Sequence, residues 1–249
     1  MDEIIRMRHL TGGYPQKEIF QDLSFTIQKG TFVTLLGPNG SGKSTLLKFL
    51  YKELKPKEGA IFLQGSDIQT MRQKQLASVI SLVPQWGRIE YDFSVREAIE
   101  MGEYAGKGTK TVGEILELCE LKEKEECSVL SLSGGEFQRT LIARSLMQGS
   151  QVMLLDEPVN NLDISSQISL MRLFRTLSEE GKTILCVLHD LTLAQVYGDE
   201  IILLSEGKIV AQGDPSSVLT KERMEEVYHC AVQKLYDPAK KRYLLSPVW

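Results

Sequence analysis

The chain has little of three features that would place it in other classes: long apolar runs, excess positive charge and paired cysteines. No stretch approaches the roughly 18 continuous apolar residues of a membrane helix, and residues 1–6 lack the apolar core of a secretory signal. With 29 basic and 33 acidic residues the net charge is −4, so a basic nucleic-acid footprint is absent. We therefore expect a soluble chain with no nucleic-acid partner, whose action at a membrane would require a partner protein.

Cysteine use and composition indicate an ordinary globular domain. The four cysteines form no C-x-x-C pair and no Cys/His cluster with zinc spacing, which favours reduced thiols in a cytosolic protein. Of the 249 residues, 42% are hydrophobic and 25% are charged, which is enough chain and enough apolar surface for a large core. The length favours a single domain with an inserted subdomain.

One motif has a specific chemical meaning. Residues 37–44 read Gly-Pro-Asn-Gly-Ser-Gly-Lys-Ser, which fits the phosphate-loop pattern G-x-x-x-x-G-K-[ST]. An apolar run at 32–36 precedes it and a helical pattern at 44–50 follows it, which is the context that such a site requires. Its glycines let backbone amides face phosphate oxygens. We expect Lys43 to reach the β- and γ-phosphates and the Ser44 hydroxyl to bind Mg²⁺.

Several short apolar runs end in a polar or glycine residue. Runs of this kind fit strands that are buried on both faces of a parallel sheet. Ligands bind outside the carboxyl ends of such strands, so the residues that follow the runs should converge on one edge. The residues that follow the runs at 32–36, 79–83, 152–155 and 184–188 include Gly37, Gln85, Asp156 and His189, respectively.

Two other regions have different patterns. Leu23, Phe25 and Ile27 alternate with polar residues, as in a half-exposed strand, which suggests an antiparallel β-layer beside the parallel sheet. Residues from about 92 to 148 are helical in pattern, and Ser94 and Thr111 each begin a capping box, in which side chains satisfy the free amides of a helix start. This helical block separates the two halves of the parallel sheet, so we interpret it as an inserted subdomain.

Asp156 and Glu157 close the apolar strand at 152–155. Beside a phosphate loop, Asp156 is expected to hold Mg²⁺ in its inner or second shell. Glu157 is expected to accept a proton from the attacking water or to orient it, a role typically worth about 10²–10⁴-fold in rate. The alternative is an acidic strand end that faces solvent, which is common when such a pair occurs alone.

A second anion-binding element is expected far downstream. Ser133-Gly134-Gly135-Glu136 fits the capping-box pattern, so Ser133 should cap a helix that runs from Glu136 through Leu146. The two glycines leave amides free to meet an anion at this helix start. Capping and anion binding are compatible, and together with the phosphate loop they suggest a nucleotide held from two sides.

The stretch Leu132-Ser133-Gly134-Gly135-Glu136-Phe137-Gln138-Arg139 resembles the signature motif of ABC-type ATPases. The resemblance covers nearly the whole chain, because the family's other motifs appear in the family's order. Tyr14 resembles the aromatic residue that stacks on adenine, and Gln85 lies where the family's glutamine loop lies. Residues 159–163 resemble the dimer-contact loop, and His189 resembles the switch histidine.

The resemblance implies an α/β fold of the P-loop NTPase class, with a RecA-like, mostly parallel sheet, an antiparallel β-layer and an inserted helical subdomain. The whole chain, 1–249, would be one ABC ATPase domain, with 1–88 and 149–249 forming the RecA-like core and 89–148 the helical signature subdomain.

It also implies a site with ATP and Mg²⁺ as ligands. Two copies would pack head to tail around two ATP molecules, each nucleotide lying between the phosphate loop of one copy and the signature motif of the other. The implied catalytic residues are Glu157, His189 and Gln85, and the implied metal ligands are Ser44, Gln85 and Asp156. The implied nucleotide-binding residues are Tyr14, Gly37, Pro38, Asn39, Gly40, Ser41, Gly42, Lys43, Ser44, Thr45, Ser133, Gly134 and Gly135.

The stretch from His189 to Tyr228, near the end of the chain, resembles the ATPase subunits of importers for iron–siderophore, haem and cobalamin. This resemblance implies a homodimer docked on two transmembrane permease subunits at the cytoplasmic, inner face of the cell membrane, with a substrate-binding protein. The alternatives are an ABC exporter ATPase, a non-transport member serving iron–sulfur assembly or DNA repair, and a nucleotide-binding regulator without catalysis. The long coiled-coil or zinc insertions of repair members are absent, and intact Glu157 and His189 argue against a regulator.

Three positions leave open questions. Trp86 and Phe93 would either contact the membrane subunit or pack at the subdomain hinge. Phe137 stands where the signature helix often has a polar residue, and it is either a core residue or a contact for the membrane partner. Asn161 stands where the dimer-contact loop more often has Ser or His, and its amide can still form hydrogen bonds.

Overall fold

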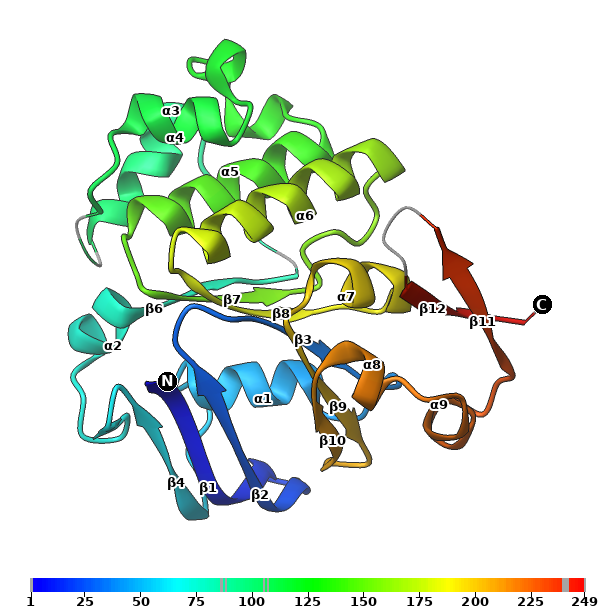
Figure 1. The fold of residues 1–249 in the computed structure, drawn as a ribbon. Helices are drawn as coiled ribbons and strands as arrows, with labels where there is room; N and C mark the ends of the chain where they lie inside the picture. The colour runs from blue at the N-terminus through cyan, green and yellow to red at the C-terminus, as the bar shows by residue number, and fades with distance from the viewer. Residues whose placement is uncertain are drawn as a thin grey trace.

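The computed structural model describes residues 2–85, 87, 89–104, 106, 108–238 and 242–248. Its centre is a six-stranded sheet in the order β10-β9-β3-β8-β7-β6 (Figure 1). Strands β6, β7, β8, β3 and β9 are parallel, and β10 runs antiparallel to β9 at the edge. The strands span Phe32–Leu36 (β3), Ile80–Val83 (β6), Val152–Asp156 (β7), Thr183–Val187 (β8), Glu200–Ser205 (β9) and Lys208–Gly213 (β10).

A second, antiparallel sheet has the order β2-β1-β4-β5. In β2 the side chains of Leu23, Phe25 and Ile27 are buried while those between them are more exposed, as the alternation predicts. The strands of this sheet span Glu3–Tyr14 (β1), Lys17–Gln28 (β2), Glu58–Leu63 (β4) and Ser66–Asp67 (β5). The last described segments, β11 (Val232–Asp237) and β12 (Arg242–Pro247), form a separate hairpin.

Helices cover both faces of the central sheet (Figure 1). On one face lie α1 (Lys43–Leu50) and α2 (Gln73–Val79), together with the antiparallel sheet. The other face carries α6 (Ile164–Glu179), α7 (Leu191–Tyr197), α9 (Lys221–Tyr228), the short α8 (Pro215–Val218) and a helical region. This region contains α3 (Val95–Glu100), α4 (Val112–Leu118) and α5 (Gly134–Met147), with short 3-10 helices at Met101–Tyr104, Lys122–Lys124 and Val129–Ser131.

Strand β3 shows why the core divides into two parts. Successive side chains of a strand point to opposite faces. Phe32 and Leu36 belong to the apolar cluster that contains α3 to α7, whereas Val33 and Leu35 belong to the cluster that contains α1 and the antiparallel sheet. Because all five residues of β3 are buried, the strand has the continuous apolar pattern of a strand covered on both faces.

The predicted architecture is confirmed: a mostly parallel sheet with helices, an antiparallel β-layer and a helical region. The exact subdomain limits at residues 88/89 and 148/149 stay a prediction.

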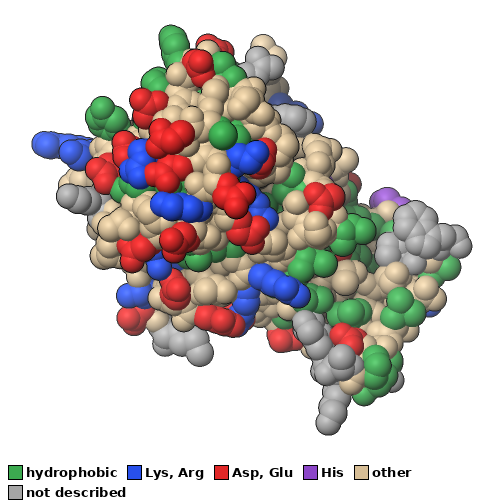
Figure 2. Space-filling view, turned by 90° about the horizontal axis from the view of Figure 1, so that it is seen from above, with side chains coloured by type: hydrophobic (Ala, Val, Ile, Leu, Met, Phe, Trp, Pro, Cys, Tyr) green, Lys and Arg blue, Asp and Glu red, His purple; other side chains and the backbone are tan. Residues whose placement is uncertain are grey.

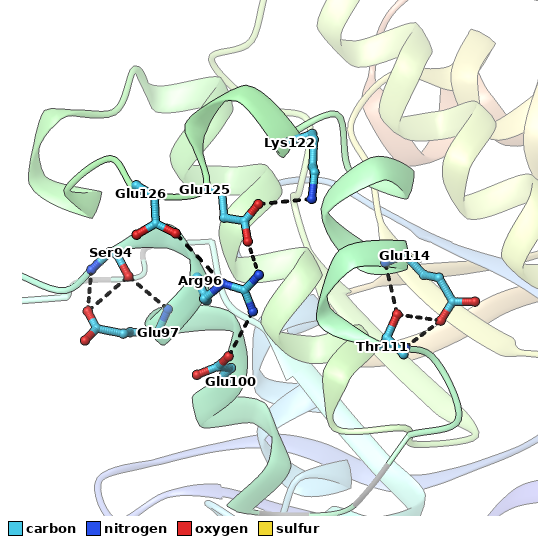
Figure 3. Close-up of polar contacts among 9 residues, drawn as sticks. All are labelled: Ser94, Arg96, Glu97, Glu100, Thr111, Glu114, Lys122, Glu125 and Glu126. Atoms are coloured by element: carbon cyan, nitrogen blue, oxygen red, sulfur yellow. Dashed lines mark hydrogen bonds and ion pairs between the residues drawn. The ribbon is translucent and has the colours of Figure 1, made fainter.

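The capping boxes predicted at Ser94 and Thr111 are present, before α3 and α4, respectively (Figure 3).

Arg96 links separate segments of the helical region (Figure 3). Its guanidinium forms ion pairs with Glu100 on the next turn of α3 and with Glu125, which also lies 3.1 Å from Lys122. Acidic and basic side chains are interspersed over this face of the molecule (Figure 2). Exposed pairs of this kind contribute little each, so we attribute the stability of this region mainly to its buried apolar side chains.

Gly207, in the turn between β9 and β10, provides a test of the packing between the two sheets. A Cβ there would lie 1.9 Å from the Ile19 carbonyl oxygen, and the backbone φ is +73°. We expect Gly207→Ala to lower the free energy of unfolding by about 3 kcal/mol, the upper end of ordinary substitutions. The control is Gly65→Ala, with φ +79° and no atom near the added Cβ, which should cost only about 1–2 kcal/mol. Equal losses in urea unfolding would contradict this explanation.

Candidate functional site

Four parallel strands end beside one another, and the residues that follow them meet at the same edge. The Gln85 amide Nε2 donates to Glu157 Oε2 at 2.6 Å, and His189 Nε2 lies 2.6 Å from Glu157 Oε1. The Ser44 hydroxyl donates to Asp156 Oδ1 at 3.1 Å. The convergence expected from the spacing of the apolar runs is therefore present, and Glu157 is at its centre.

The phosphate loop joins β3 to α1, and its shape requires glycine. Gly42 precedes the first helical residue with φ +108°, and a Cβ there would lie 2.8 Å from the Phe20 ring. At Gly37 a Cβ would lie 2.0 Å from the Leu204 carbonyl oxygen, whereas at Gly40 nothing lies within 4 Å. The loop is thus packed against the sheet at its start and open at its tip. Pro38, Asn39 and Thr45 complete this segment and the first turn of α1.

Polar groups in the loop have the chemistry of an anion site. Lys43 is only 6% exposed, and its ammonium donates to the carbonyls of Gly37 at 2.7 Å and Pro38 at 2.9 Å. Burial lowers the pKa of Lys43, although the charges of Glu157 and Asp156 oppose that shift. Among the described residues, the buried Ser41 hydroxyl has no hydrogen-bond partner. A buried polar atom without a partner is unfavourable, and a phosphate oxygen would supply one.

Glu157 has an unusual backbone and three side-chain partners. Its φ is +52°, in the left-handed region that non-glycine residues seldom adopt. Its side chain is 12% exposed, and besides Gln85 and His189 it accepts a hydrogen bond from the Asn160 amide. Strained backbone of this kind often occurs at functional sites, where the surrounding structure holds it in place. The turn from Glu157 to Asn160 places the side-chain amide of Asn160 against the Glu157 carboxylate.

Asn160 is a partner that the motif analysis missed. The motifs place Asn160 only within the stretch that resembles a dimer-contact loop, yet its side-chain amide donates to the Glu157 carboxylate. The sequence signal for this contact is the position of Asn160 three residues after Glu157, because a tight turn brings such residues together. The turn is present: the backbone N–H of Asn160 donates to the backbone carbonyl of Glu157 at 3.2 Å.

Asp156 is partly buried, like its neighbour Glu157. Burial raises its pKa, while the hydrogen bond from Ser44 opposes that shift, and the nearby charge of Glu157 raises it further. A positive ion placed near Asp156 and Ser44 would favour the charged carboxylate. These two side chains supply the oxygen donors that Mg²⁺ prefers.

The signature stretch forms a capped helix start, with one correction. Helix α5 begins at Gly134, not at Glu136 as expected, because Ser133 is the residue before the first helical turn. The Ser133 hydroxyl accepts from the Glu136 backbone amide at 3.3 Å, and the Glu136 carboxylate accepts from the Ser133 amide at 2.8 Å. Both glycines therefore lie inside the first turn, where backbone amides have no partner within the helix.

The two anion-binding elements do not meet within one chain. Ser133 and Gly134 are exposed, and a Cβ on Gly134 would meet no atom of the described residues within 4 Å. Gly135 faces Leu162 and Ser166, neither of which belongs to the phosphate loop. Helices α1 and α5 also pack on opposite faces of the central sheet. The signature residues are thus free to meet a group outside their own chain.

Glu136 gives the cap a pH dependence. The hydrogen bond from the Ser133 amide, together with Lys124, lowers the pKa of Glu136 to about 2 from an ordinary 4.5. Because its folded-state pKa is lowered, its contribution is complete above about pH 4.5 and is lost as the pH falls toward 2. We expect Glu136→Ala to lower the thermal midpoint at pH 7, and the gap to wild type to narrow below pH 4.5. A gap that stays constant down to pH 3 would contradict this role.

Tyr14 ends β1 and is 38% exposed. The ammonium of Lys48, one turn after Ser44 on α1, lies 5.5 Å from the centre of the Tyr14 ring. Such a distance is within the range of a cation–π contact. The exposure of Tyr14 agrees with a stacking role, and Lys48 is a neighbour that the motifs did not indicate.

The remaining expectations have mixed outcomes. Trp86 lies outside the described residues, so the choice between contact with a membrane subunit and packing at the subdomain hinge stays open. Phe93 packs partly against the apolar cluster of the helical region, and its ring lies 6.1 Å from that of Tyr91. Phe137 also packs against that cluster, which supports its interpretation as a core residue. Asn161 takes φ +62°, a conformation that Asn tolerates better than most residues.

Known proteins resemble the chain over almost its full length. The ABC transporter family model matches residues 20–160. The ferric enterobactin transport ATP-binding protein FepC of Escherichia coli is 37% identical, over 98% of this chain and 94% of its own. The hemin import ATP-binding protein HmuV of Rhizobium meliloti is 34% identical, over 95% of each chain.

Two solved structures agree with these matches. One belongs to a transporter assigned to the metal-chelate type of ABC transporter, in an inward-facing conformation; it has a TM-score of 0.84 and 25% identity, over 99% of this chain and 98% of its own. The other is a dimeric ATP-binding cassette in a post-hydrolysis state with ADP and phosphate, with a TM-score of 0.75 and 26% identity, over 85% of this chain and 99% of its own. The chain therefore belongs to the ATP-binding proteins of the ABC transporter family.

Proposed function

We propose that the chain is the ATP-hydrolysing subunit of an importer for an iron–siderophore, haem or cobalamin-type metal chelate. The observation that carries the ATPase role is the Glu157 carboxylate, held by Gln85, Asn160 and His189 beside the phosphate loop. The cargo class is supported by similarity to proteins named for ferric enterobactin and hemin.

The phosphate loop is assigned to ATP. Lys43 would leave the carbonyls of Gly37 and Pro38 and bind the β- and γ-phosphates, while the Ser41 hydroxyl would gain a phosphate partner. Backbone amides around Gly40 and Gly42 and the start of α1 would hold the other phosphate oxygens. Tyr14 would stack on the adenine.

Mg²⁺ fits the donor atoms at this edge. Mg²⁺ is usually held by one or two carboxylates together with substrate phosphates, and the Ser44 hydroxyl and the Asp156 carboxylate lie 3.1 Å apart. Ser44, Asp156 and the Gln85 amide oxygen would hold the ion. When bound, it would neutralise charge on the phosphates.

Glu157 is assigned as the group that orients or deprotonates the attacking water. In the structure both of its carboxylate oxygens are already engaged, one by Gln85 and Asn160 and the other by His189. ATP would draw His189 toward the γ-phosphate and Gln85 toward the metal, which frees the carboxylate for a water. The site would therefore become active only when nucleotide is bound.

Two copies are assigned to each functional unit. Ser133, Gly134 and Gly135 do not reach the phosphate loop of their own chain, and the dimeric cassette found among the similar structures supports pairing. In a head-to-tail homodimer the free amides of α5 would meet the γ-phosphate held by the other copy. ATP would favour the closed dimer because its γ-phosphate contacts both sides.

The dimer is assigned to the inner face of the cell membrane, on two permease subunits that work with a substrate-binding protein. Among the described residues, no helix combines the length and apolar character needed to cross a bilayer. Membrane attachment would therefore come from the permease.

The proposal is tested with the permease that copurifies with this chain, reconstituted together with it in lipid vesicles. ATP hydrolysis should rise when a ferric siderophore, haem or cobalamin is added with its binding protein, and that chelate should accumulate inside the vesicle. The Glu157→Gln complex is the control and should do neither. Outward movement of the chelate would contradict an importer, and so would an ATP hydrolysis rate that is the same with and without the permease.

A further inference from the structure

Lys48 lies where the base end and the phosphate end of the site come together. It follows Ser44 by four residues on α1, so both side chains are on the same face of the helix. Its ammonium is 5.5 Å from the centre of the Tyr14 ring. It also lies close enough to Asp156 for its charge to favour that carboxylate.

Electrostatic attraction explains why the Lys48 ammonium lies over the Tyr14 ring. Within the described residues, Lys48 forms no salt bridge, and its side chain is only partly exposed. A cation is attracted to the negative face of an aromatic ring, and the attraction grows as water is excluded. The ring in turn is restrained, because a side chain with a bound cation on one face has fewer orientations available.

We propose that Lys48 is a positioning residue for the nucleotide base: its ammonium occupies one face of the Tyr14 ring and holds the opposite face ready for adenine. The inference rests on the proposed function, because it takes Tyr14 as the adenine platform. The proposed role of Lys48 is in binding the base and not the phosphates, although its charge also acts on Asp156 at the phosphate end of the site.

The size of the effect follows from the strength of the contact. An exposed cation–π contact corresponds to about a 2- to 5-fold change in an equilibrium constant. Lys48→Met keeps much of the length of the side chain and removes the charge, so it should weaken ATP binding by that factor. Lys48→Arg keeps a cation that stacks well on aromatic rings and should restore wild-type affinity.

The experiment measures binding by calorimetry in EDTA, where hydrolysis does not interfere. The ligands are ATP and inorganic triphosphate, and the proteins are wild type, Lys48→Met, Lys48→Arg and the exposed-charge control Lys55→Met. A Tyr14→Ala series with and without Lys48→Met completes a double-mutant cycle. Thermal midpoints of all variants show whether any loss comes from unfolding.

Support requires that Lys48→Met loses 2- to 5-fold in ATP affinity, that Lys55→Met loses none, and that the loss disappears when Tyr14 is Ala. Unchanged or tighter ATP binding by Lys48→Met would overturn the proposal, as would an equal loss toward triphosphate or a loss that persists without the ring. Failure of the proposed function looks different: wild type itself would not bind ATP.

Discussion

Replacing Glu157 with Gln is expected to reduce ATP hydrolysis by about 10²–10⁴-fold while leaving ATP binding close to wild type. Gln has nearly the same shape, so the partners Gln85 and Asn160 keep a neighbour, but an amide cannot accept a proton from water. The change therefore removes an interaction needed in the transition state and spares those that hold the ground state. Steady-state phosphate release and calorimetric ATP binding measure the two effects separately.

A matched control is Glu117→Gln, which removes one exposed carboxylate from the helical region. It should hydrolyse ATP at the wild-type rate. If Glu157→Gln hydrolyses ATP within a few fold of wild type, Glu157 is not the group that activates water. If it fails to bind ATP, the carboxylate is needed for the ground state, and its assigned role is also wrong.

Replacing Lys43 with Met is expected to weaken ATP binding, which Glu157→Gln leaves close to wild type. The lost contact is a charge-assisted one, worth about 1.5–3 kcal/mol, so ATP affinity should fall by about 10- to 150-fold. Hydrolysis at saturating ATP should fall as well, because in the proposed site the ammonium would also contact the γ-phosphate. Calorimetry gives the affinity, and ATP should no longer raise the thermal midpoint as it does for wild type.

Stability must be checked beside this result, since the Lys43 ammonium also binds two loop carbonyls. Thermal unfolding without nucleotide shows whether weaker ATP binding comes from a lost phosphate contact or from an unfolded variant. A folded variant that does not bind ATP supports the assignment of Lys43 to the phosphates. A folded variant with wild-type affinity would show that the phosphates bind elsewhere.

The motifs located most of the site because parallel strands impose a simple rule. Apolar runs of four or five residues predict buried strands, and the residues that follow them have to meet at one edge. The spacing therefore predicts that Gln85, Asp156 and His189 lie near one another. The phosphate loop could be predicted because its shape depends on glycines at fixed positions, two of which would collide with Phe20 and Leu204 if they carried a Cβ.

What the sequence left out depends on turns and on side-chain direction. Asn160 binds Glu157 because the backbone turns sharply after a left-handed residue, and no periodic pattern encodes that turn. The start of α5 at Gly134 depends on which residue of Ser133-Gly134-Gly135-Glu136 leaves the helical conformation. Lys48 meets Tyr14 across 34 positions of sequence, which requires β1 and α1 to be packed together first.

The central claim is that one ATP site is built from two copies of the chain, and sedimentation equilibrium of Glu157→Gln tests it most directly. In Mg-ATP the variant should sediment with twice the 28.0 kDa mass of one chain, because ATP stays bound and unhydrolysed between two copies. With ADP, or with Ser133→Arg added to block the signature contact, it should remain a monomer. A 28.0 kDa species in saturating Mg-ATP would contradict the claim.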